Sequence, residues 1–465
     1  MTIQQALDAA TNGAIIEVMP SDTSPSGAYV ENITFPAKTV TLRSVDPDDP
    51  AVVAATVIDG NNSGSVVSFD SGATADAILE GFTIQNGQAG SGAGVACSSS
   101  SPMICKCVIT DNHAVDASGQ VLGGTISGGG SSATIRECVI RGNSIDSSRE
   151  GFGNIAFLGG APVIIDCTIV ENTTTATNIA YAGGIYLYDC DATVTGCTIA
   201  GNHCFAGGYA EGGGIGLSGD TAPRIANCTI ADNTLSAPVS LGGGLRCVGM
   251  TKPTLAHCTI SGNTADHGSA IWCHSDGTVV ELRNCVLWAN GPPTWHSISA
   301  EQDAVVRIAY TDIQWGTGGV ELGTGASLEW LDGNIDADPL FVDPSGPDGD
   351  PDTWQDNDYH LQPGSPCISA GDPAFVLLPD ETDIDGDLRL QGCRVDMGSD
   401  ETRFGQRGDF DNDGDVDLAD YHMFESCLTG PGTDILDHCG CANLDGDNDV
   451  DLADFAGFQE AFTAE

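Results

Sequence analysis

Residues 183–202 decide the fold, and they read Gly183-Gly-Ile-Tyr-Leu-Tyr-Asp-Cys-Asp-Ala-Thr-Val-Thr-Gly-Cys197-Thr-Ile-Ala-Gly-Asn202. The last six residues are one copy of the pattern Cys-(Thr/Val)-(Ile/Leu)-x-x-Asn, which occurs seven times at intervals of 27–31 residues. A unit of this size cannot bury its apolar face alone, whereas stacked units bury a continuous core. The repeat therefore predicts a solenoid in which each copy belongs to one coil.

Three columns of residues recur at fixed places in the repeat, and alternation with a period of two places the apolar ones on an inward face. We expect the cysteines to be small, buried apolar side chains rather than metal ligands. They are Cys107, Cys138, Cys167, Cys197, Cys228, Cys258 and Cys285. The apolar residues two positions later are Ile109, Ile140, Ile169, Ile199, Ile230, Ile260 and Leu287. The asparagines, which we expect to hydrogen-bond from coil to coil, are Asn112, Asn143, Asn172, Asn202, Asn233, Asn263 and Asn290.

A second strand precedes the cysteine in each coil and alternates in the same way. Its first expected inward column is Ile155, Ile185, Ile215, Leu245 and Ile271. Its second is Phe157, Leu187, Leu217, Cys247 and Cys273. Two or more short strands per coil, separated by Gly, Asn, Asp and Ser turns, indicate an all-β fold, a right-handed parallel β-helix.

The ends of such a rod need caps, because open strand edges invite aggregation. Ile3, Leu7 and Ala10 have helical spacing, so we expect a short N-terminal helix over a first coil that begins near Ile15. The periodicity fades after Trp330. We therefore divide the chain into a cap helix and β-helix (1–340), a C-terminal cap (341–404) and a small α-helical calcium-binding module (405–465).

The chain is strongly acidic, with 15 Lys and Arg against 65 Asp and Glu and a formal net charge of -50. This charge repels nucleic acid and anionic lipid and favours divalent cations as partners. No stretch approaches 18 consecutive apolar residues, so we expect no membrane span. The residues that follow Met1 lack a charged region, an apolar region and a cleavage site, so we expect no export signal in this chain.

Cysteines outside the repeats have the pattern of disulfide partners. Cys367 with Cys393, and Cys427 with either Cys439 or Cys441, are the alternatives that the sequence leaves open. Disulfides would imply an oxidising compartment. The last three thiols would in principle suit zinc, but a structural zinc site needs four ligands and no suitably spaced histidine is present.

The strongest chemical motif is Asp409-Phe-Asp-Asn-Asp-Gly-Asp-Val-Asp-Leu-Ala-Asp420. Its spacing is that of an EF-hand loop, in which side-chain oxygens at positions 1, 3, 5, 9 and 12 and a carbonyl at position 7 surround Ca²⁺, and glycine at position 6 allows the sharp turn. We therefore expect a calcium site. Its residues are Asp409, Asp411, Asp413, Asp415, Asp417 and Asp420.

A second copy of the motif lies 34 residues later, in residues 443–454. Asn443 replaces the first carboxylate, and Asn448 replaces the turn glycine, a position where asparagine tolerates the left-handed backbone. We expect the loss of one charge to weaken this site without abolishing it. Its residues are Asn443, Asp445, Asp447, Asp449, Asp451 and Asp454.

The two loops, each followed by a helix-like segment and each ending in Asp rather than Glu, resemble type I dockerin modules. This resemblance implies a Ca²⁺ cofactor and a cohesin-like partner, or self-association through the module. Tyr359-His-Leu-Gln-Pro-Gly-Ser-Pro-Cys-Ile-Ser-Ala-Gly-Asp372, with residues 382–387 and 395–401, resembles the terminal segment of bacterial surface β-helix proteins of the choice-of-anchor Q type. That resemblance implies a C-terminal cap and an extracellular or cell-surface location.

The β-helix fold is similar to that of the pectin-lyase-like superfamily, which includes polysaccharide lyases and glycoside hydrolases. Polygalacturonase-like chains carry Asn-Thr-Asp, Asp-Asp, Gly-His-Gly and Arg-Ile-Lys in order; here only Asp48-Asp49 is present, in an expected turn. Basic residues, which uronate lyases need, are dispersed. The sequence thus favours a non-catalytic protein. The alternatives are a lyase or hydrolase that carries a dockerin, and a surface fibre cross-bridged by calcium.

One outward face suggests glycan binding, because aromatic rings and a guanidinium on a flat sheet stack on sugar rings. Its residues are Tyr186, Tyr188, Arg246, Trp272 and His274. The alternative is that the long turns around 173–182 and 203–212 fold over these side chains and bury them.

Overall fold

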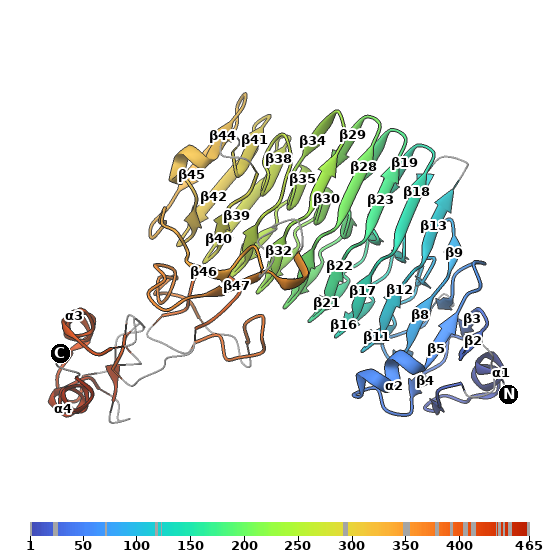
Figure 1. Ribbon diagram of the computed structural model, residues 1–465, viewed down its shortest axis with the longest axis horizontal. Coiled ribbons are helices and arrows are strands. Elements are labelled where there is room, and N and C mark those ends of the chain that lie inside the picture. The colour runs from blue at the N-terminus through green and yellow to red at the C-terminus, as the bar shows by residue number, and fades with distance from the viewer. Residues whose placement is uncertain are drawn as a thin grey trace.

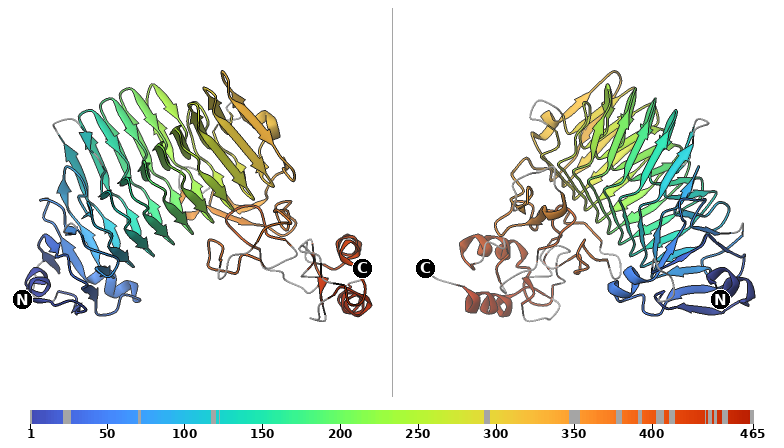
Figure 2. Two further views of the ribbon diagram at one scale, coloured as in Figure 1. Left: turned by 180° about the vertical axis from the view of Figure 1, so that it is seen from behind. Right: turned by 45° about the vertical axis from the view of Figure 1, so that its right-hand side comes forward.

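The chain forms a parallel β-helix, a rod of stacked coils, as seen in a computed structural model (Figure 1). The views in Figure 2 show the same coils from behind and obliquely, with the N-terminal helix at one end of the stack. The structure describes residues 2–21, 27–69, 72–116, 120–121, 123–291, 296–346, 354–376, 381–390, 394–402, 408–410, 415–433, 435, 439, 442–444 and 449–462.

Three long parallel sheets, named A, B and C, enclose the core of the rod. Sheet A contains β1 (Ile15–Val18), β4 (Thr41–Ser44), β7 (Ile78–Glu80), β11 (Met103–Cys105), β16 (Thr134–Arg136), β21 (Val163–Ile165), β26 (Thr193–Thr195), β31 (Arg224–Ala226), β36 (Thr254–Ala256), β39 (Val279–Arg283), β42 (Val305–Ala309) and β45 (Ser327–Trp330). Sheet B contains β2 (Ala28–Val30), β5 (Val57–Asp59), β8 (Thr83–Gln85), β12 (Val108–Thr110), β17 (Val139–Arg141), β22 (Thr168–Val170), β27 (Thr198–Ala200), β32 (Thr229–Ala231), β37 (Thr259–Ser261), β40 (Val286–Trp288) and β43 (Asp312–Ile313). Sheet C contains β3 (Ile33–Phe35), β6 (Val67–Phe69), β10 (Val95–Ala96), β15 (Ile126–Gly129), β20 (Ile155–Leu158), β25 (Ile185–Tyr188), β30 (Ile215–Gly219), β35 (Leu245–Gly249), β38 (Ile271–His274), β41 (Ile298–Glu301) and β44 (Val320–Leu322).

Coils in the middle of the rod carry two further strands between sheets B and C. Sheet D contains β9 (Gln88–Ala89), β13 (His113–Asp116), β18 (Ser144–Ser147), β23 (Thr173–Ala176), β28 (His203–Ala206) and β33 (Thr234–Ser236). Sheet E contains β14 (Gln120–Val121), β19 (Glu150–Phe152), β24 (Ile179–Tyr181), β29 (Tyr209–Glu211) and β34 (Val239–Leu241). Small side chains from both sheets, such as Ala176, Ala180 and Cys204, share one buried cluster. Sheets D and E thus form a two-layered fin on the rod.

The core confirms the inward columns expected from the repeat. Each repeat cysteine is at most 1% exposed, and the isoleucine column behind it is fully buried. In sheet C, Ile185 pairs with Ile215 and Ile215 with Leu245, so like residues stack from coil to coil. A left-handed backbone conformation precedes each cysteine, as at Gly196 (φ 62°), and turns the chain from sheet A to sheet B.

The asparagine column is a continuous hydrogen-bonded ladder, as expected. The backbone N–H of Asn202 donates to Oδ1 of Asn233 at 3.0 Å, and Nδ2 of Asn202 donates to the same oxygen at 3.0 Å. Nδ2 also donates to the carbonyl of Ile169 at 2.9 Å. Every amide in the column is at most 1% exposed, so these bonds satisfy groups that water does not reach.

The N-terminal helix α1 (Ile3–Ala9) covers the first coil with buried Ile3 and Leu7, as the sequence predicts. A capping box at Thr2 fixes its start. A second short helix, α2 (Pro50–Ala55), begins at Asp49, whose side chain accepts a hydrogen bond from the N–H of Ala51. One 3₁₀ turn, η1 (Gly316–Gly319), lies next to the last strands of sheets B and C.

The C-terminal segment, meaning the described residues of 341–402, runs back along the outside of the rod instead of covering its open end. It contains the antiparallel pair β46 (Phe341–Asp343) and β47 (Asp358–Leu361) and the 3₁₀ turn η2 (Trp354–Asp356). Tyr359 packs on the outward residues Val170, Ala200 and Ala231 of sheet B. Small side chains on three successive strands of sheet B make room for it.

Arg389 fastens the C-terminal segment to the rod. Its side chain is completely buried, and its Nε and Nη2 donate to Nδ1 of His257 at 3.1 and 2.7 Å. The other guanidinium hydrogens go to the carbonyls of Ser399 and Gly398, at 3.0 and 2.5 Å, and Glu401 lies 3.7 Å away. A buried charge is tolerated only when it is paired and hydrogen-bonded in this way.

Candidate functional site

The C-terminal module contains two helices with matching first turns, α3 (Leu418–Cys427) and α4 (Leu452–Ala461). Asp417 is the N-cap of α3, with φ -130° and ψ -154°, and Asp451 is the N-cap of α4, with φ -133° and ψ -154°. In each helix the aspartate three residues later accepts a hydrogen bond from the N–H of the cap, at 2.8 Å. The duplicated sequence therefore folds into duplicated local geometry.

Each first turn brings three carboxylates together. Oxygens of Asp415, Asp417 and Asp420 lie within 4.8 Å of one another, and those of Asp449, Asp451 and Asp454 do the same. Asp409 and Asp420, the expected first and last ligands, are 1% and 0% exposed. Asn443 is half-buried. The remaining expected ligands and turn residues lie outside the described residues: Asp411, Asp413, Gly414, Asp445, Asp447 and Asn448.

These donor sets fit calcium in chemistry, because hard carboxylate oxygens are the ligands that Ca²⁺ prefers. Phe410, Phe424 and Phe458 stack in one core under both loops, with ring centroids 5.3–6.2 Å apart. The two halves of the module therefore share a core. Cys427 pairs with Cys439 in a disulfide, one of the two alternatives expected.

Cys367 is a free thiol, so the expected disulfide between Cys367 and Cys393 is wrong. Its Sγ lies 3.3 Å from Oδ2 of Asp312 on the rod, and burial raises its pKa. The C-terminal segment is thus held here by packing and hydrogen bonds. Cys393 and Cys441 lie outside the described residues.

The expected glycan face is mostly covered. Tyr186, Arg246 and Trp272 are 4%, 7% and 7% exposed, so burial, the alternative reading, is what the structure shows for them. The covering residues belong to sheet E: the Tyr181 ring lies 5.9 Å from that of Tyr186, and Oε2 of Glu211 lies 2.7 Å from Nε of Arg246. Tyr186 and Arg246 thus join the fin to sheet C.

Two residues of that set remain accessible. Tyr188 is 41% exposed, and His274 is half-buried with its ring 5.2 Å from that of Trp272. Glycan binding at this edge therefore stays a prediction that rests on Tyr188 and His274. The sequence could not place the fin over its neighbours, because the angle between two sheets is set by packing rather than by the repeat.

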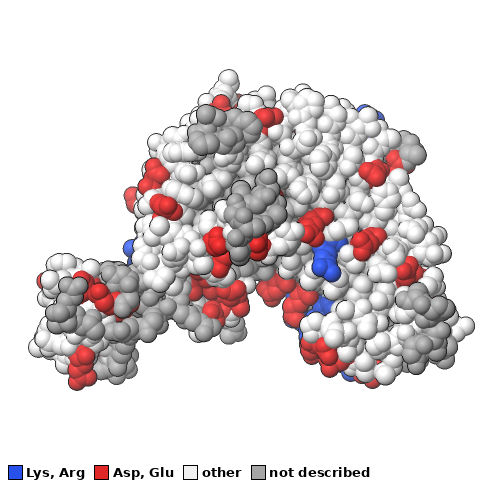
Figure 3. Space-filling model, viewed as in Figure 1, with Lys and Arg blue, Asp and Glu red and all other residues white. Residues whose placement is uncertain are grey.

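An acidic groove that the sequence reasoning missed lies between sheet B and the C-terminal segment. Its volume is about 410 Å³. Its walls include Thr198 and Asp232 on the rod and Asn357, Tyr359 and His360 on the segment. Figure 3 shows acidic side chains gathered along the edge where the segment meets the rod.

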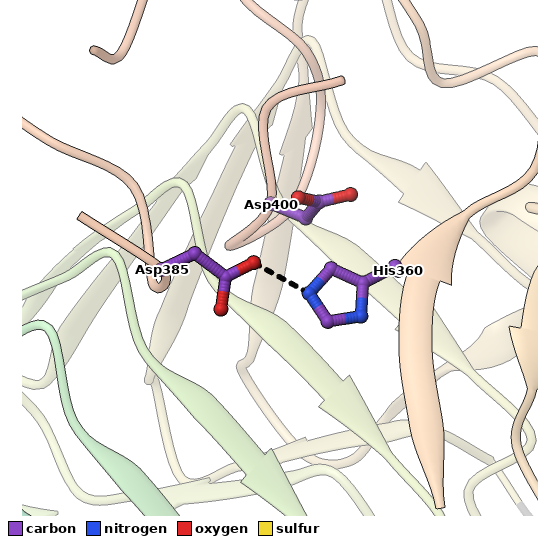
Figure 4. A group of neighbouring side chains, drawn as sticks. All are labelled: His360, Asp385 and Asp400. Carbon is purple, nitrogen blue, oxygen red and sulfur yellow. Dashed lines mark hydrogen bonds and ion pairs between the residues drawn. The ribbon is translucent and has the colours of Figure 1, made fainter. Parts of the chain in front are cut away.

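Three side chains from separate stretches of the segment meet in this groove, and Figure 4 shows them pointing toward a common centre. Ligand atoms of His360, Asp385 and Asp400 all lie within 4.8 Å of one another. Nε2 of His360 lies 2.6 Å from Oδ2 of Asp385, and Nδ1 lies 2.5 Å from Oδ1 of Asp358. No sequence pattern marks this group, because its members are 15–40 residues apart and follow no repeat.

The carboxylates set the charge of this histidine. Burial opposes the charged ring, but the hydrogen bonds to Asp358 and Asp385 outweigh it and raise the pKa of His360 to about 9. Burial also raises the pKa of Asp400. An isolated imidazole is mostly neutral at pH 7. In the groove, by contrast, the His360 ring is protonated at this pH unless another cation replaces the proton.

The fold and the repeat place this chain in the class of parallel β-helix proteins. A family model described as the right handed beta helix region matches residues 163–328, which cover the coils with the most regular repeat. No curated protein matches the chain. Among the described residues, the helices are all too short or too polar to cross a bilayer.

Proposed function

We propose that this is a non-catalytic extracellular or cell-surface protein, in which the β-helix is a rigid rod and the C-terminal module binds Ca²⁺ and docks the rod to a partner. The observation that carries the proposal is the matched pair of acidic first turns in α3 and α4. Both copies of the loop motif reach the same cap geometry and the same three-carboxylate arrangement. We do not expect an acidic tail without a binding role to adopt the same cap geometry twice.

In the first loop, Asp415, Asp417 and Asp420 are the described residues that would hold the ion, together with the buried Asp409. Asp420 already accepts hydrogen bonds from the N–H groups of Phe410 and Asp417, at 2.5 and 2.8 Å, so its carboxylate is oriented by the backbone. Bound Ca²⁺ would supply positive charge and link the loop to the helix that follows. In the second loop Asn443 replaces one carboxylate, which supports a weaker site.

The module also offers surface for a partner. Leu418 and Leu452, the first residues of the two helices, occupy equivalent positions and are 64% and 77% exposed. Large exposed apolar side chains at matching places favour protein contact over solvation. The partner that the dockerin resemblance implies is a cohesin-like protein, and self-association through the module is the alternative.

Calcium titration of the full-length protein tests the first part of the proposal. We expect isothermal titration calorimetry to show two sites, with calcium-dependent resistance of the module to protease. Asp420→Ala should remove the tighter site, and Asp454→Ala the weaker one. Glu425→Ala, an exposed acidic residue on α3 outside the loops, is the matched control and should leave both sites intact. Identical titrations for all four proteins would contradict the proposal.

The docking and non-catalytic parts need their own measurements. Immobilised cohesin domain should retain the protein in Ca²⁺ and release it in chelator, and sedimentation with and without chelator tests self-association. A panel of polysaccharides incubated with the protein and Ca²⁺ should release neither reducing ends nor unsaturated uronates. Depolymerisation of any substrate would instead establish the lyase or hydrolase alternative.

A further inference from the structure

The group of His360, Asp385 and Asp400 has the form of a metal site, and all three residues precede the calcium loops. His360 lies on β47, Asp385 in the turn after Asp383, and Asp400 near the end of the C-terminal segment. Their three ligand atoms lie within 4.8 Å of one another. An imidazole nitrogen and two carboxylate oxygens are a donor set for borderline divalent metals rather than for calcium, which takes oxygen ligands.

Neighbouring groups hold each of these side chains in the orientation that a metal requires. Asp358 contacts Nδ1 of His360 at 2.5 Å, which leaves Nε2 facing Asp385 and Asp400. Metal-binding histidines in proteins commonly donate their second N–H to a carboxylate, because this contact fixes the tautomer and the ring. The N–H of Leu361 donates to Oδ2 of Asp400 at 3.1 Å.

The groove leaves space for further ligands. Its volume of about 410 Å³ is open to solvent, and the side chain of His360 is 45% exposed. The buried Oδ1 of Asn357 has no hydrogen-bond partner among the described residues, although Nδ2 of the same side chain donates to Asp232 at 3.1 Å. A hydrated cation in the groove would supply the missing donor through its water.

We propose that His360, Asp385 and Asp400 bind one divalent transition-metal ion, Zn²⁺ being the best match, with water in the remaining positions. Nε2 of His360 and one oxygen from each aspartate are the ligands, and Asp358 is a positioning residue. The ion would join β47 to two later parts of the segment and so strengthen the attachment of the segment to the rod. Three protein ligands and an open position define a site that also accepts a small ligand from the groove.

The test uses the full-length protein with its calcium sites saturated by excess Ca²⁺. Co²⁺, a spectroscopic substitute for Zn²⁺, should bind with one equivalent and give visible absorption bands that Zn²⁺ then removes. His360→Gln should lower the affinity at least 100-fold, and Asp358→Asn should lower it about 10- to 100-fold. His113→Gln is the matched control, because His113 also lies beside one carboxylate, Asp146 at 3.6 Å, but belongs to no group of three such ligands among the described residues.

Circular dichroism of each variant shows whether the fold is retained, and Asp385→Asn provides a second ligand variant that changes charge but not shape. Loss of the bands in both ligand variants with an intact fold would establish the site. No Co²⁺ binding in excess Ca²⁺ would overturn it. Unchanged binding in His360→Gln would also overturn it, since the ion would then reside elsewhere, in the calcium loops or on the acidic surface.

Discussion

The rod and the C-terminal segment both bury polar groups, but they satisfy them in opposite ways. In the rod, each asparagine amide bonds to the next amide, and the same contact recurs from Asn112 to Asn290. In the segment, one arginine meets one histidine and a few carbonyls, and the contact occurs once. When one amide of the ladder is lost, the other coils keep the same hydrogen bonds. When the arginine is lost, the contact that attaches the segment to the rod is lost with it. The two regions should therefore respond differently to the loss of one side chain.

Arg389→Met should have the largest effect. The change leaves Glu401, 1% exposed at its side chain, without its cation, and breaking a buried pair costs about 3–5 kcal/mol. We expect the segment to detach while the rod persists, so that hydrogen exchange rises in residues 381–402 and calorimetry shows a separate early transition. Arg307→Met, which removes exposed contacts to Glu281 and Glu329, is the control and should cost about 0–1 kcal/mol. Equal losses of stability in Arg389→Met and Arg307→Met would contradict the expected difference between the segment and the rod.

Asn202→Ala should have an intermediate effect confined to the rod. The change removes a side chain that accepts from the N–H of Asn172 and donates to Ile169 and Asn233, at 2.9–3.1 Å. Leaving such buried groups unsatisfied costs about 1–3 kcal/mol. Chemical denaturation should show this loss, with hydrogen exchange raised only in neighbouring coils. A detached C-terminal segment in this variant would show that the two regions are coupled.

Acid should weaken the contribution of His257 to the attachment of the segment. Burial, and then the charge of Arg389, lower the pKa of His257 below its ordinary value of 6.5. The neutral His257 ring contributes its full stability above pH 6.5. This contribution is lost as the pH falls toward the lowered pKa, because His257 takes up a proton in the detached state before it does so in the attached state. The slope is at most about 1.4 kcal/mol per pH unit. Between pH 6.5 and 5 the melting temperature of the segment should therefore fall relative to that of His257→Gln. The comparison with this variant is needed because burial raises the pKa of Asp396 to about 6, which acts in the opposite direction in both proteins.

The same contrast explains what could be read from the sequence. The cysteine, isoleucine and asparagine columns follow from periodicity alone, because one rule recurs in every coil. The helices α3 and α4 after the two loops could be predicted for the same reason, since the loop is duplicated. No rule relates Arg389 to His257, which are 132 residues apart, or His360 to Asp385 and Asp400. Burial of Tyr186 and Arg246 was also undecided, because it depends on how the fin folds over sheet C.

The cysteine column has a consequence for following the rod in solution. The described part of the chain holds 14 free cysteines, and all are buried. Burial raises the pKa of Cys97 and Cys190 to about 12, and in the folded rod burial keeps all of these thiols, those of the cysteine column included, out of contact with a reagent in solution. A reagent that labels thiols therefore leaves the folded rod unmodified and reacts only where coils open. Mass spectrometry of the labelled cysteines then reports, coil by coil, where the rod first comes apart.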